Sequence, residues 1–381
     1  MRILVIGRSF PEKNTGMLGV FEMDQALALK NKGNEVRYFF CDTRSIFRIQ
    51  RIDKVDFEYQ GIIVSGCYLP IGRLPYYLFS SIKTKVYLTH LKKVISDFMP
   101  EVIHIHYPSI VMTEAIWKYI RSLDAAIFAT EHYTKIMTLQ IPKRIRNLET
   151  CVLKESDGFI CVSGRLRDSV ENISNIKGKV LVLPNMVSGT FNIGKVSEDK
   201  DVIFTYVGAA RKVKQIDKLL EAFCILLKTR ADCRLRIIGD GPEIRKIKNL
   251  ACKLGIINKV NFYGNVSRND VAILLGETDY FITASCLETF CVPVVEAWCC
   301  GIPTIISDNI PLLNYANEDN AIVYRDSDIQ DMADAMYKAI KNGPMYNQKK
   351  ISDEAKHYFS SETISTKLME LYVQAVGRRK L

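Results

Sequence analysis

The sequence predicts an α/β protein with two doubly wound, Rossmann-like sheets, and two observations lead to this fold class. Short runs rich in β-branched residues alternate with longer segments of helical periodicity from end to end. The runs are apolar without strict alternation, which indicates strands that are covered on both faces, as in a parallel sheet. Repeated strand–helix units of this kind are typical of nucleotide-binding α/β domains.

The expected strands fall into two sets. The first set comprises residues 2–6, 35–40, 102–106, 126–130, 158–162 and 179–183, and the second comprises residues 202–207, 234–238, 260–263, 280–283, 303–306 and 321–323. After the first strand, Val20, Met23 and Leu27 keep the i, i+3, i+7 spacing of one helix face, and Gly33 predicts where that helix ends.

The two sets are separated by the segment 184–190, which is rich in turn-forming residues. We therefore expect an N-terminal domain over residues 1–186, a C-terminal domain over 187–358 and a closing segment over 359–381. Two such domains would face each other across a cleft, where a ligand would bind. Because ligands of parallel sheets bind at the carboxyl ends of the strands, the loops that follow the strands are the candidate sites.

Composition limits the classes of partner. Lys and Arg number 52 against 42 Asp and Glu, a formal net charge of +10 among 381 residues, which suits an anionic small molecule or membrane surface. No basic run is interleaved with aromatic residues in the way a nucleic-acid groove binder requires, so nucleic acid is not expected as a partner. No run of about 18 apolar residues and no signal peptide are evident, so we expect a cytoplasmic protein.

The cysteines give no sign of bridging or of metal binding. Their number is odd, 11, and neither a CxxC pair nor the spacing of zinc ligands occurs. We expect reduced thiols, no metal and no cofactor.

The segment 72–94 interrupts the alternation of strands and helices. It places basic residues among aromatic and aliphatic ones: Arg73, Lys83, Lys85, Lys92 and Lys93 among Leu74, Tyr76, Tyr77, Leu78, Phe79, Val86, Tyr87 and Leu88. Two interpretations stay open, a helix that lies on an anionic leaflet and a core-packed helix with a basic outer face. The first would attach the protein peripherally to the inner face of the plasma membrane.

The segment 285–297 carries the strongest chemical signal. Glu288 and Glu296 stand eight positions apart after an expected strand. In a helix they would be separated by about 12 Å, beyond the roughly 5–10 Å of a glycosidase carboxylate pair. The free N–H groups of a helix N-terminus would lie between them and could bind phosphate. This order suits the sugar, diphosphate and ribose of one elongated ligand.

Here the chain resembles the retaining glycosyltransferases of family 4, and the resemblance covers nearly the whole chain. Besides the Glu-x7-Glu segment, the motifs that carry it are Gly16-x-x-Gly19, residues 102–106, Thr130-Glu131-His132, residues 156–163, Leu183-Pro184-Asn185, Val207-Gly208 with Lys214, and residues 238–242 and 262–266. The family has the GT-B fold. The resemblance therefore implies two Rossmann-like domains that face across an interdomain cleft, with a C-terminal helix that crosses back to the N-terminal domain.

The resemblance implies catalytic roles for three residues. Lys214 matches the lysine that neutralises the donor diphosphate, whose charge grows as the glycosidic bond breaks. Glu288 matches a carboxylate near the transferred sugar. His132 matches a histidine of the N-terminal domain that reaches toward the sugar and the leaving phosphate.

It also implies substrate-binding roles for further residues. Glu296 matches the carboxylate that accepts hydrogen bonds from the ribose hydroxyls, and Val266 lies where the family grips the base with main chain. Gly16 and Gly19 would let the backbone approach the donor closely, because glycine lacks a Cβ and tolerates positive φ. The N–H groups that would hold phosphate oxygens belong to Phe290, Cys291 and Val292.

Three positions depart from the family pattern. Where the family commonly has arginine after Gly208, this chain has Ala209, and Arg211 is the candidate to supply a guanidinium from a shifted loop. The usual glycine after the lysine is Gln215, and a second expected glycine is Cys291. A Cβ at that second position would crowd the phosphate unless φ there is negative.

The function so implied is transfer of a sugar, of hexosyl type, from a nucleotide-sugar donor to a glycan or lipid-linked acceptor with retention of configuration, in cell-surface polysaccharide synthesis. Two alternatives stay open: a non-catalytic partner subunit that binds nucleotide sugars, and a nucleotide-sugar epimerase of the GT-B fold. For Glu288 and Glu296 the plainer interpretation is a pair of helix-capping or solvated carboxylates. We expect His104 and His106 to face opposite sides of their strand and take no part in catalysis, and Arg8 to be solvated.

Overall fold

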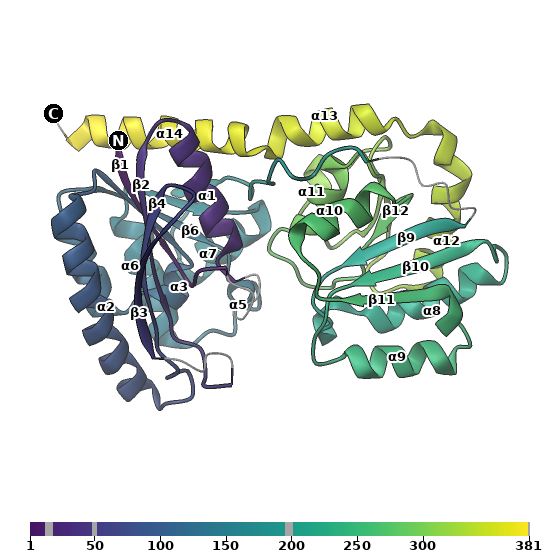
Figure 1. Cartoon of the computed structure of the whole chain (residues 1–381), viewed down its shortest axis with the longest axis horizontal. Helices are drawn as coiled ribbons and strands as arrows, with labels where there is room; N and C mark the ends of the chain where they lie inside the picture. Colours follow the sequence, from purple (N-terminus) through teal and green to yellow (C-terminus); the bar gives the residue numbers. More distant parts are fainter. Residues whose placement is uncertain (12–17, 48–51, 195–200, 380–381) are drawn as a thin grey trace. The chain divides into compact units, whose positions relative to one another are not determined.

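The computed structural model describes residues 1–11, 18–47, 52–194 and 201–379 (Figure 1). The chain divides into two compact units, Met1–Met186 with Ser361–Leu381, and Val187–Ser360. It passes from the first unit to the second after Met186 and returns after Ser360. Both passages meet inside the second unit, where the Val187 N–H donates to the Phe359 carbonyl over 2.8 Å.

The first unit is built on an eight-stranded sheet in the order β3-β4-β2-β1-β5-β6-β7-β8. Its strands are β1 (Arg2–Gly7), β2 (Glu35–Asp42), β3 (Asp53–Tyr59), β4 (Ile62–Tyr68), β5 (Val102–His106), β6 (Ala126–Glu131), β7 (Gly158–Cys161) and β8 (Val180–Val182). All pairs are parallel except β3 with β4. Every strand expected for this unit is present.

The hairpin of β3 and β4 was not expected from the sequence. Its turn residues Gln60 and Gly61 have φ values of 48° and 73°, the two positive values that a tight hairpin turn requires. On β3 exposed and half-buried positions alternate, since one face of this edge strand stays open. Because its side chains alternate between exposed and half-buried, β3 has no continuous apolar run from which a strand could be predicted.

Helices cover both faces of this sheet. They are α1 (Val20–Asn31), α2 (Tyr76–Phe98), α3 (Pro108–Val111), α4 (Glu114–Arg121), α5 (Thr134–Met137), α6 (Lys143–Glu155), α7 (Gly164–Ser174) and α14 (Ser361–Arg379). The C-terminal helix α14 lies beside α1 (Figure 1), and its Ile364, Leu368 and Tyr372 join the core beneath α1. The N-terminal fold is thus completed by the last residues of the chain.

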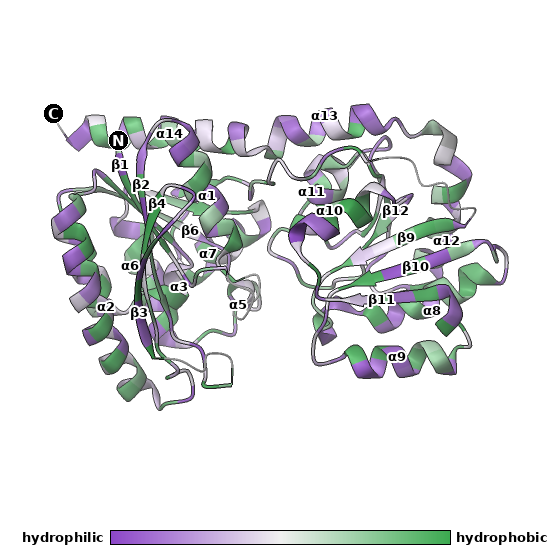
Figure 2. Cartoon of the chain, viewed as in Figure 1, coloured by the Kyte–Doolittle hydropathy of each residue, from purple (hydrophilic) through white to green (hydrophobic). Residues whose placement is uncertain are grey.

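Helix α2 combines the two interpretations left open for residues 72–94. Its second half packs on the sheet, where the Tyr87 ring lies 5.0 Å from that of Phe39. Lys83, expected on a basic surface, is buried, and its Nζ donates to the Ile110 carbonyl over 2.7 Å. The start of the helix stays exposed, with Tyr77 72% accessible, and hydrophobic and hydrophilic residues alternate along the helix (Figure 2).

The second unit has a six-stranded sheet in the order β11-β10-β9-β12-β13-β14. Its strands are β9 (Val202–Val207), β10 (Cys233–Ile238), β11 (Val260–Gly264), β12 (Tyr280–Ile282), β13 (Thr304–Ser307) and β14 (Ala321–Tyr324), all parallel and all expected. This is the doubly wound Rossmann order. The order reverses between β9 and β12, which makes their carboxyl ends the topological switch point where such sheets bind ligands.

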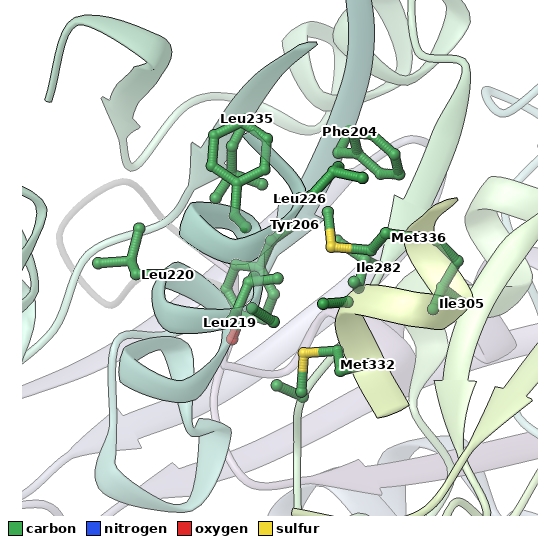
Figure 3. Close-up of a cluster of buried hydrophobic side chains, with 14 of the residues drawn as sticks. Phe204, Tyr206, Leu219, Leu220, Leu226, Leu235, Ile282, Ile305, Met332 and Met336 are labelled. Carbon is green, nitrogen blue, oxygen red and sulfur yellow. The ribbon is translucent and has the colours of Figure 1, made fainter. Parts of the chain in front are cut away.

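Helices also flank this sheet, with its main core on one face. The helices are α8 (Ile216–Leu227), α9 (Ile244–Lys253), α10 (Arg268–Gly276), α11 (Val292–Cys299), α12 (Ile329–Asn342) and α13 (Gln348–Phe359), with the short helices η1 (Lys212–Lys214), η2 (Ile257–Lys259), η3 (Leu313–Tyr315) and η4 (Gly343–Met345). Leu219 of α8 and Met332 of α12 meet Phe204 and Ile282 of the strands in this core (Figure 3). Among the described residues, no helix is both long and apolar enough to cross a bilayer.

Replacement of Leu368 by alanine should destabilise the first unit, because this α14 side chain is 1% exposed within its core. We expect a loss of about 3 kcal/mol, as for a leucine removed from a packed core. Urea unfolding monitored by circular dichroism measures it. Val373→Ala on the same helix, at a side chain 59% exposed, is the control, and an equal effect of both variants would contradict the packing role of α14.

Candidate functional site

Four loops of the second unit gather at the carboxyl edge of its sheet, after β9, β10, β11 and β12. The first two pack so closely that a Cβ on Gly239 would lie 2.1 Å from the Gly208 carbonyl oxygen. Gly239 also has a φ of 127° and donates its N–H to the Gly264 carbonyl over 2.8 Å. Glycine is required here, since a side chain fits neither the conformation nor the space. The loop that carries Lys214 is thereby fixed against its neighbour.

An ion pair joins the loops on either side of the switch point. The Lys214 ammonium, at the end of η1, donates to Oε1 of Glu288 in the loop after β12. The two side chains are 22% and 14% exposed. Burial lowers the pKa of Lys214, but the Glu288 carboxylate outweighs it and the net shift is upward, so the ammonium stays charged at physiological pH. The structure thus brings together two residues, Lys214 and Glu288, that the sequence predicted separately for the site.

Arg211 lies close to this pair. It is exposed, and its positive charge lowers the pKa of Lys214 against the larger effects of burial and of Glu288. Its own N–H donates to the Ala209 carbonyl over 2.8 Å, and its carbonyl accepts from the Lys214 N–H over 2.9 Å. The tight turn therefore brings a guanidinium to the loop in which Ala209 stands in the place of the family arginine.

The loop after β12 leads into α11 through a residue in the left-handed region. Cys291 precedes the helix with φ 75° and ψ 68°. Among the described residues, the backbone N–H groups of Phe290, Cys291 and Val292 donate to no backbone carbonyl or side chain. Pro293 follows at the start of the helix and has no N–H to offer. Within the described chain, these three N–H groups are therefore free to bind an anion, as the sequence predicts.

Both glycine positions that this chain has lost keep a backbone that glycine favours. Gln215 has a φ of 45° and Cys291 a φ of 75°. The condition for an uncrowded phosphate at residue 291, a negative φ, is therefore not met. The thiol is buried, and burial followed by the neighbouring Glu288 carboxylate raises its pKa, so it stays protonated.

Glu296 lies further along α11 and is 8% exposed. Its Oε1 is 3.6 Å from Nη2 of Arg268, whose guanidinium also lies 5.4 Å from the ring of Phe191. Val266 is half-buried in the loop between β11 and α10, directly before the Ser267 that caps α10. Arg268 belongs to no motif that the sequence offers, and only the fold brings it to Glu296.

Tyr206 is a second residue that the sequence analysis did not single out. This β9 side chain is 1% exposed, and its hydroxyl has no hydrogen-bond partner within the described chain. Burial, followed by the charge of Glu288, raises its pKa well above the usual value. The hydroxyl is therefore a neutral polar group next to the Lys214–Glu288 pair.

In the first unit, Gly19 opens α1 with a φ of 94° and packs against the loop after β1, where a Cβ would lie 2.1 Å from the Ser9 carbonyl oxygen. Gly16 lies outside the described residues. Arg8 is not solvated as expected: its Nε is 3.1 Å from Oε1 of buried Glu22, and its guanidinium lies 3.3 Å from the centre of the Tyr107 ring. A buried carboxylate requires a counter-charge, which explains why Arg8 stays inside.

His132 is buried among other histidines. Its Nε2 is 3.0 Å from Nδ1 of His106, and the rings of His106 and His104 are 4.7 Å apart. The expectation that His104 and His106 face opposite sides is wrong, because residues two apart on a strand point to the same face. His106 and His132 also line a cavity of about 20 Å³, room for a single water.

The loop that carries His132 is anchored by the carboxylate of Glu131. Its Oε1 accepts from the N–H groups of His132 and Tyr133 over 2.8 and 2.7 Å, and its Oε2 accepts from the Ser109 hydroxyl over 2.6 Å. Burial raises the pKa of Glu131 although these hydrogen bonds oppose the shift. The position of the His132 backbone is therefore fixed by a side chain of the strand itself.

Models of two glycosyltransferase families match the chain. The model of the group 1 glycosyl transferases matches residues 190–358, and that of glycosyltransferase family 4 matches residues 19–189. The alpha-monoglucosyldiacylglycerol synthase of Streptococcus pneumoniae is 27% identical over 64% of this chain and 58% of its own length. The chain spans about three fifths of the length of the curated relatives it matches.

Two solved structures share the fold. Sucrose-phosphate synthase of Thermosynechococcus elongatus superposes with a TM-score of 0.79 at 17% identity, over 99% of each chain. Anabaena HepE, solved in complex with UDP-glucose, gives a TM-score of 0.73 at 14% identity, over 98% of this chain and 100% of that one. These likenesses identify the fold as GT-B.

The buried histidines should make the first unit sensitive to acid. Burial, followed by the Arg8 charge, lowers the pKa of His106 to about 3, whereas an unfolded chain binds that proton below about pH 6.5. The unfolded state therefore gains protons as the pH falls below about 6.5, and stability is lost. Replacement of His106 by glutamine removes this contribution. Between pH 7 and pH 5, wild type should lose about 2 kcal/mol more than the variant.

Urea unfolding at the two pH values measures this difference. Because Glu131 shifts in the opposite direction, only the comparison between the two proteins isolates the histidine. Parallel pH dependence in both would contradict a neutral, buried His106.

Proposed function

Because the chain belongs to the family 4 and group 1 glycosyltransferases, we propose that it transfers a hexosyl group from a nucleotide sugar to a glycan or lipid-linked acceptor with retention of configuration, in cell-surface polysaccharide synthesis. The second unit would bind the donor and the first unit the acceptor. The resident chemistry would come from the chain alone, without metal or cofactor.

The observation that carries this proposal is the Lys214–Glu288 pair beside the N-terminus of α11, at the switch point of the second sheet. A departing nucleoside diphosphate gains negative charge as the glycosidic bond breaks. A fixed ammonium and preorganised N–H groups stabilise that charge more in the transition state than in the ground state, which lowers the barrier. Arg211 would supply a second cation.

We propose a front-face route for the transfer. The acceptor hydroxyl attacks the anomeric carbon on the side from which the diphosphate leaves, and its proton passes to the departing phosphate oxygen. The leaving phosphate then acts as the base, so no second carboxylate is needed for a double displacement. Lys214 and the N–H groups of Cys291 and Val292 would hold the phosphate, while Glu288 would hydrogen-bond the sugar.

For the donor, we propose a uridine diphosphate sugar. Its support is the structure of HepE, which was solved with UDP-glucose and shares this fold. Glu296 would accept hydrogen bonds from the ribose hydroxyls with Arg268 beside it, and the main chain at Val266 would contact the base. A thermal-shift screen of UDP-, GDP- and ADP-sugars identifies the donor, because a ligand of the native state raises the midpoint by mass action.

Two other functions make different demands on the same site. An epimerase would convert the donor into a new nucleotide sugar without an acceptor, which chromatography of the nucleotides detects. A non-catalytic subunit would bind the donor and neither hydrolyse nor transfer it. Transfer is favoured over both because the two family models that match the chain are those of glycosyltransferases.

An exposed surface of the first unit supports a membrane-bound acceptor. It combines large apolar side chains with arginines that lie over aromatic rings: Arg73 is 4.3 Å from the Phe47 ring centre and Arg144 is 3.9 Å from that of Tyr76. Phe47 and Tyr77 are 68% and 72% exposed. Apolar side chains mixed with cations suit the interface of an anionic bilayer. We propose that this apolar–cationic surface attaches the enzyme to the inner face of the plasma membrane, where a lipid-linked acceptor would lie.

Replacement of Lys214 by alanine should lower kcat by at least about 100-fold, because it removes the cation that faces the developing charge. Glu288→Ala should have a comparable effect on transfer. Lys212→Ala is the matched control: Lys212 lies in the same short helix but is exposed, and should retain activity. Radiolabelled transfer from the donor found in the screen measures the rates. Near-normal turnover of Lys214→Ala, with its melting midpoint unchanged, would refute the assigned role.

Replacement of Arg144 by serine should weaken binding to vesicles that contain anionic lipid. A basic residue near such a surface contributes about 1 kcal/mol, so affinity should fall roughly fivefold and the salt dependence should decrease. Co-sedimentation with mixed phosphatidylglycerol and phosphatidylcholine vesicles measures it. Arg325→Ser, which removes an exposed arginine of the second unit, is the control, and equal binding of both variants would exclude this surface.

A further inference from the structure

Two cysteines of the first unit lie side by side within the sheet. Cys41 of β2 and Cys67 of β4 are register partners on adjacent parallel strands. Their Sγ atoms are 3.0 Å apart, both thiols are free, and both side chains are buried. Adjacent strands are about 4.8 Å apart, within the Cα separation that a disulfide spans. The strands can therefore accept a disulfide without separating.

Charged and titratable side chains of α2 cover this pair. Lys83 is 1% exposed, and its pKa is lowered by burial to about 8 while both cysteines oppose the shift. His90 is 6% exposed, and its Nε2 lies 3.6 Å from Oδ1 of Asp56, whose side chain is 60% exposed. The dithiol thus lies one layer below the surface, beside a cation and an imidazole.

The two thiols are not equivalent. Contact with Cys41, and after it with His90, lowers the pKa of Cys67, whereas contact with Cys67 and burial raise that of Cys41. Of the two thiols, Cys67 is therefore the more acidic. A thiolate beside a thiol is the arrangement in which one sulfur reacts with an oxidant and the other resolves the product.

We propose that Cys41 and Cys67 form a modification site, a dithiol that hydrogen peroxide oxidises reversibly to a disulfide between β2 and β4. The Cys67 thiolate attacks one peroxide oxygen, an S–O bond forms and the O–O bond breaks, and the released hydroxide takes up a proton to become water. The Cys41 sulfur then attacks Sγ of Cys67. The S–S bond forms as the S–O bond breaks, and the second hydroxide leaves as water with the Cys41 proton.

The step balances, since two thiols and one peroxide give one disulfide and two waters. It also changes the electrostatics beneath α2. A disulfide carries no charge, so the buried Lys83 loses the negative partner that a Cys67 thiolate supplies. An unpaired buried ammonium is costly, and oxidation should therefore weaken the packing of α2 on the sheet. Reduction by a small thiol restores the original state.

The experiment uses the full chain with its exposed thiols removed by Cys151→Ser and Cys252→Ser. The protein is treated with hydrogen peroxide, its remaining thiols are blocked with N-ethylmaleimide in denaturant, and peptides are mapped by mass spectrometry without reduction. We expect one linked peptide pair that contains Cys41 and Cys67, and its loss after dithiothreitol. Recovery of both cysteines as maleimide adducts, or of Cys67 only as sulfinic acid, would overturn the proposal.

Two variants set the specificity of this result. Cys67→Ala in the same background should yield no linked pair. Cys161→Ala removes a cysteine that is equally buried but lies on β7, and it should leave the linked pair in place. If Cys41 were instead found linked to another cysteine in Cys67→Ala, the reaction of Cys41 would be assigned to that other thiol. Because the linkage is mapped in a chain that keeps both cysteines, the test does not depend on the folding of either variant.

Discussion

The Lys214–Glu288 ion pair is the interaction on which the proposed donor site of the second unit depends. It joins residues 74 positions apart, and it does so at the one place in the second sheet where the strand order reverses. Neither charge could stay in so sheltered a position alone, because removal of one partner leaves the other uncompensated. In the proposed function, a diphosphate that entered this site would replace Glu288 as the anionic partner of Lys214. The pair therefore keeps the ammonium charged and in place before the ligand arrives.

The backbone around this pair contains two residues that adopt a conformation favoured by glycine although neither is glycine. Gln215 and Cys291 hold positive φ values although neither is glycine. Each costs on the order of 1 kcal/mol relative to glycine. The surroundings compensate: the side-chain Oε1 of Gln215 accepts from the Ser327 hydroxyl over 3.2 Å, and the Cys291 side chain is buried. Both loops thus hold a positive φ at a residue other than glycine.

The parallel strands of both sheets could be predicted because a strand that is buried on both faces has a continuous run of apolar residues in its sequence. The hairpin of β3 and β4 escaped because its outer strand lies at the edge, where only one face is covered. The prediction that His104 and His106 face opposite sides was wrong although the sequence contained the information, because residues two apart on a strand point to the same face. Two contacts could not be predicted from local sequence: Arg268 with Glu296, and His106 with His132. Each contact joins two different elements, and the spacing of residues along the chain does not show which loops the fold brings together.

The two units differ in the electrostatic character of their predicted site residues, and this difference bears on the proposed mechanism. The second unit keeps its cation charged by pairing it with a carboxylate. In the first unit, burial followed by the charges of its neighbours lowers the pKa of His132 well below the usual value, so its imidazole is neutral at physiological pH. A neutral imidazole whose Nε2 meets His106 can donate or accept one hydrogen bond, but it supplies no positive charge to a leaving phosphate. In the proposed mechanism, stabilisation of that charge would therefore come from the second unit, and the front-face route would require of His132 no more than a hydrogen bond.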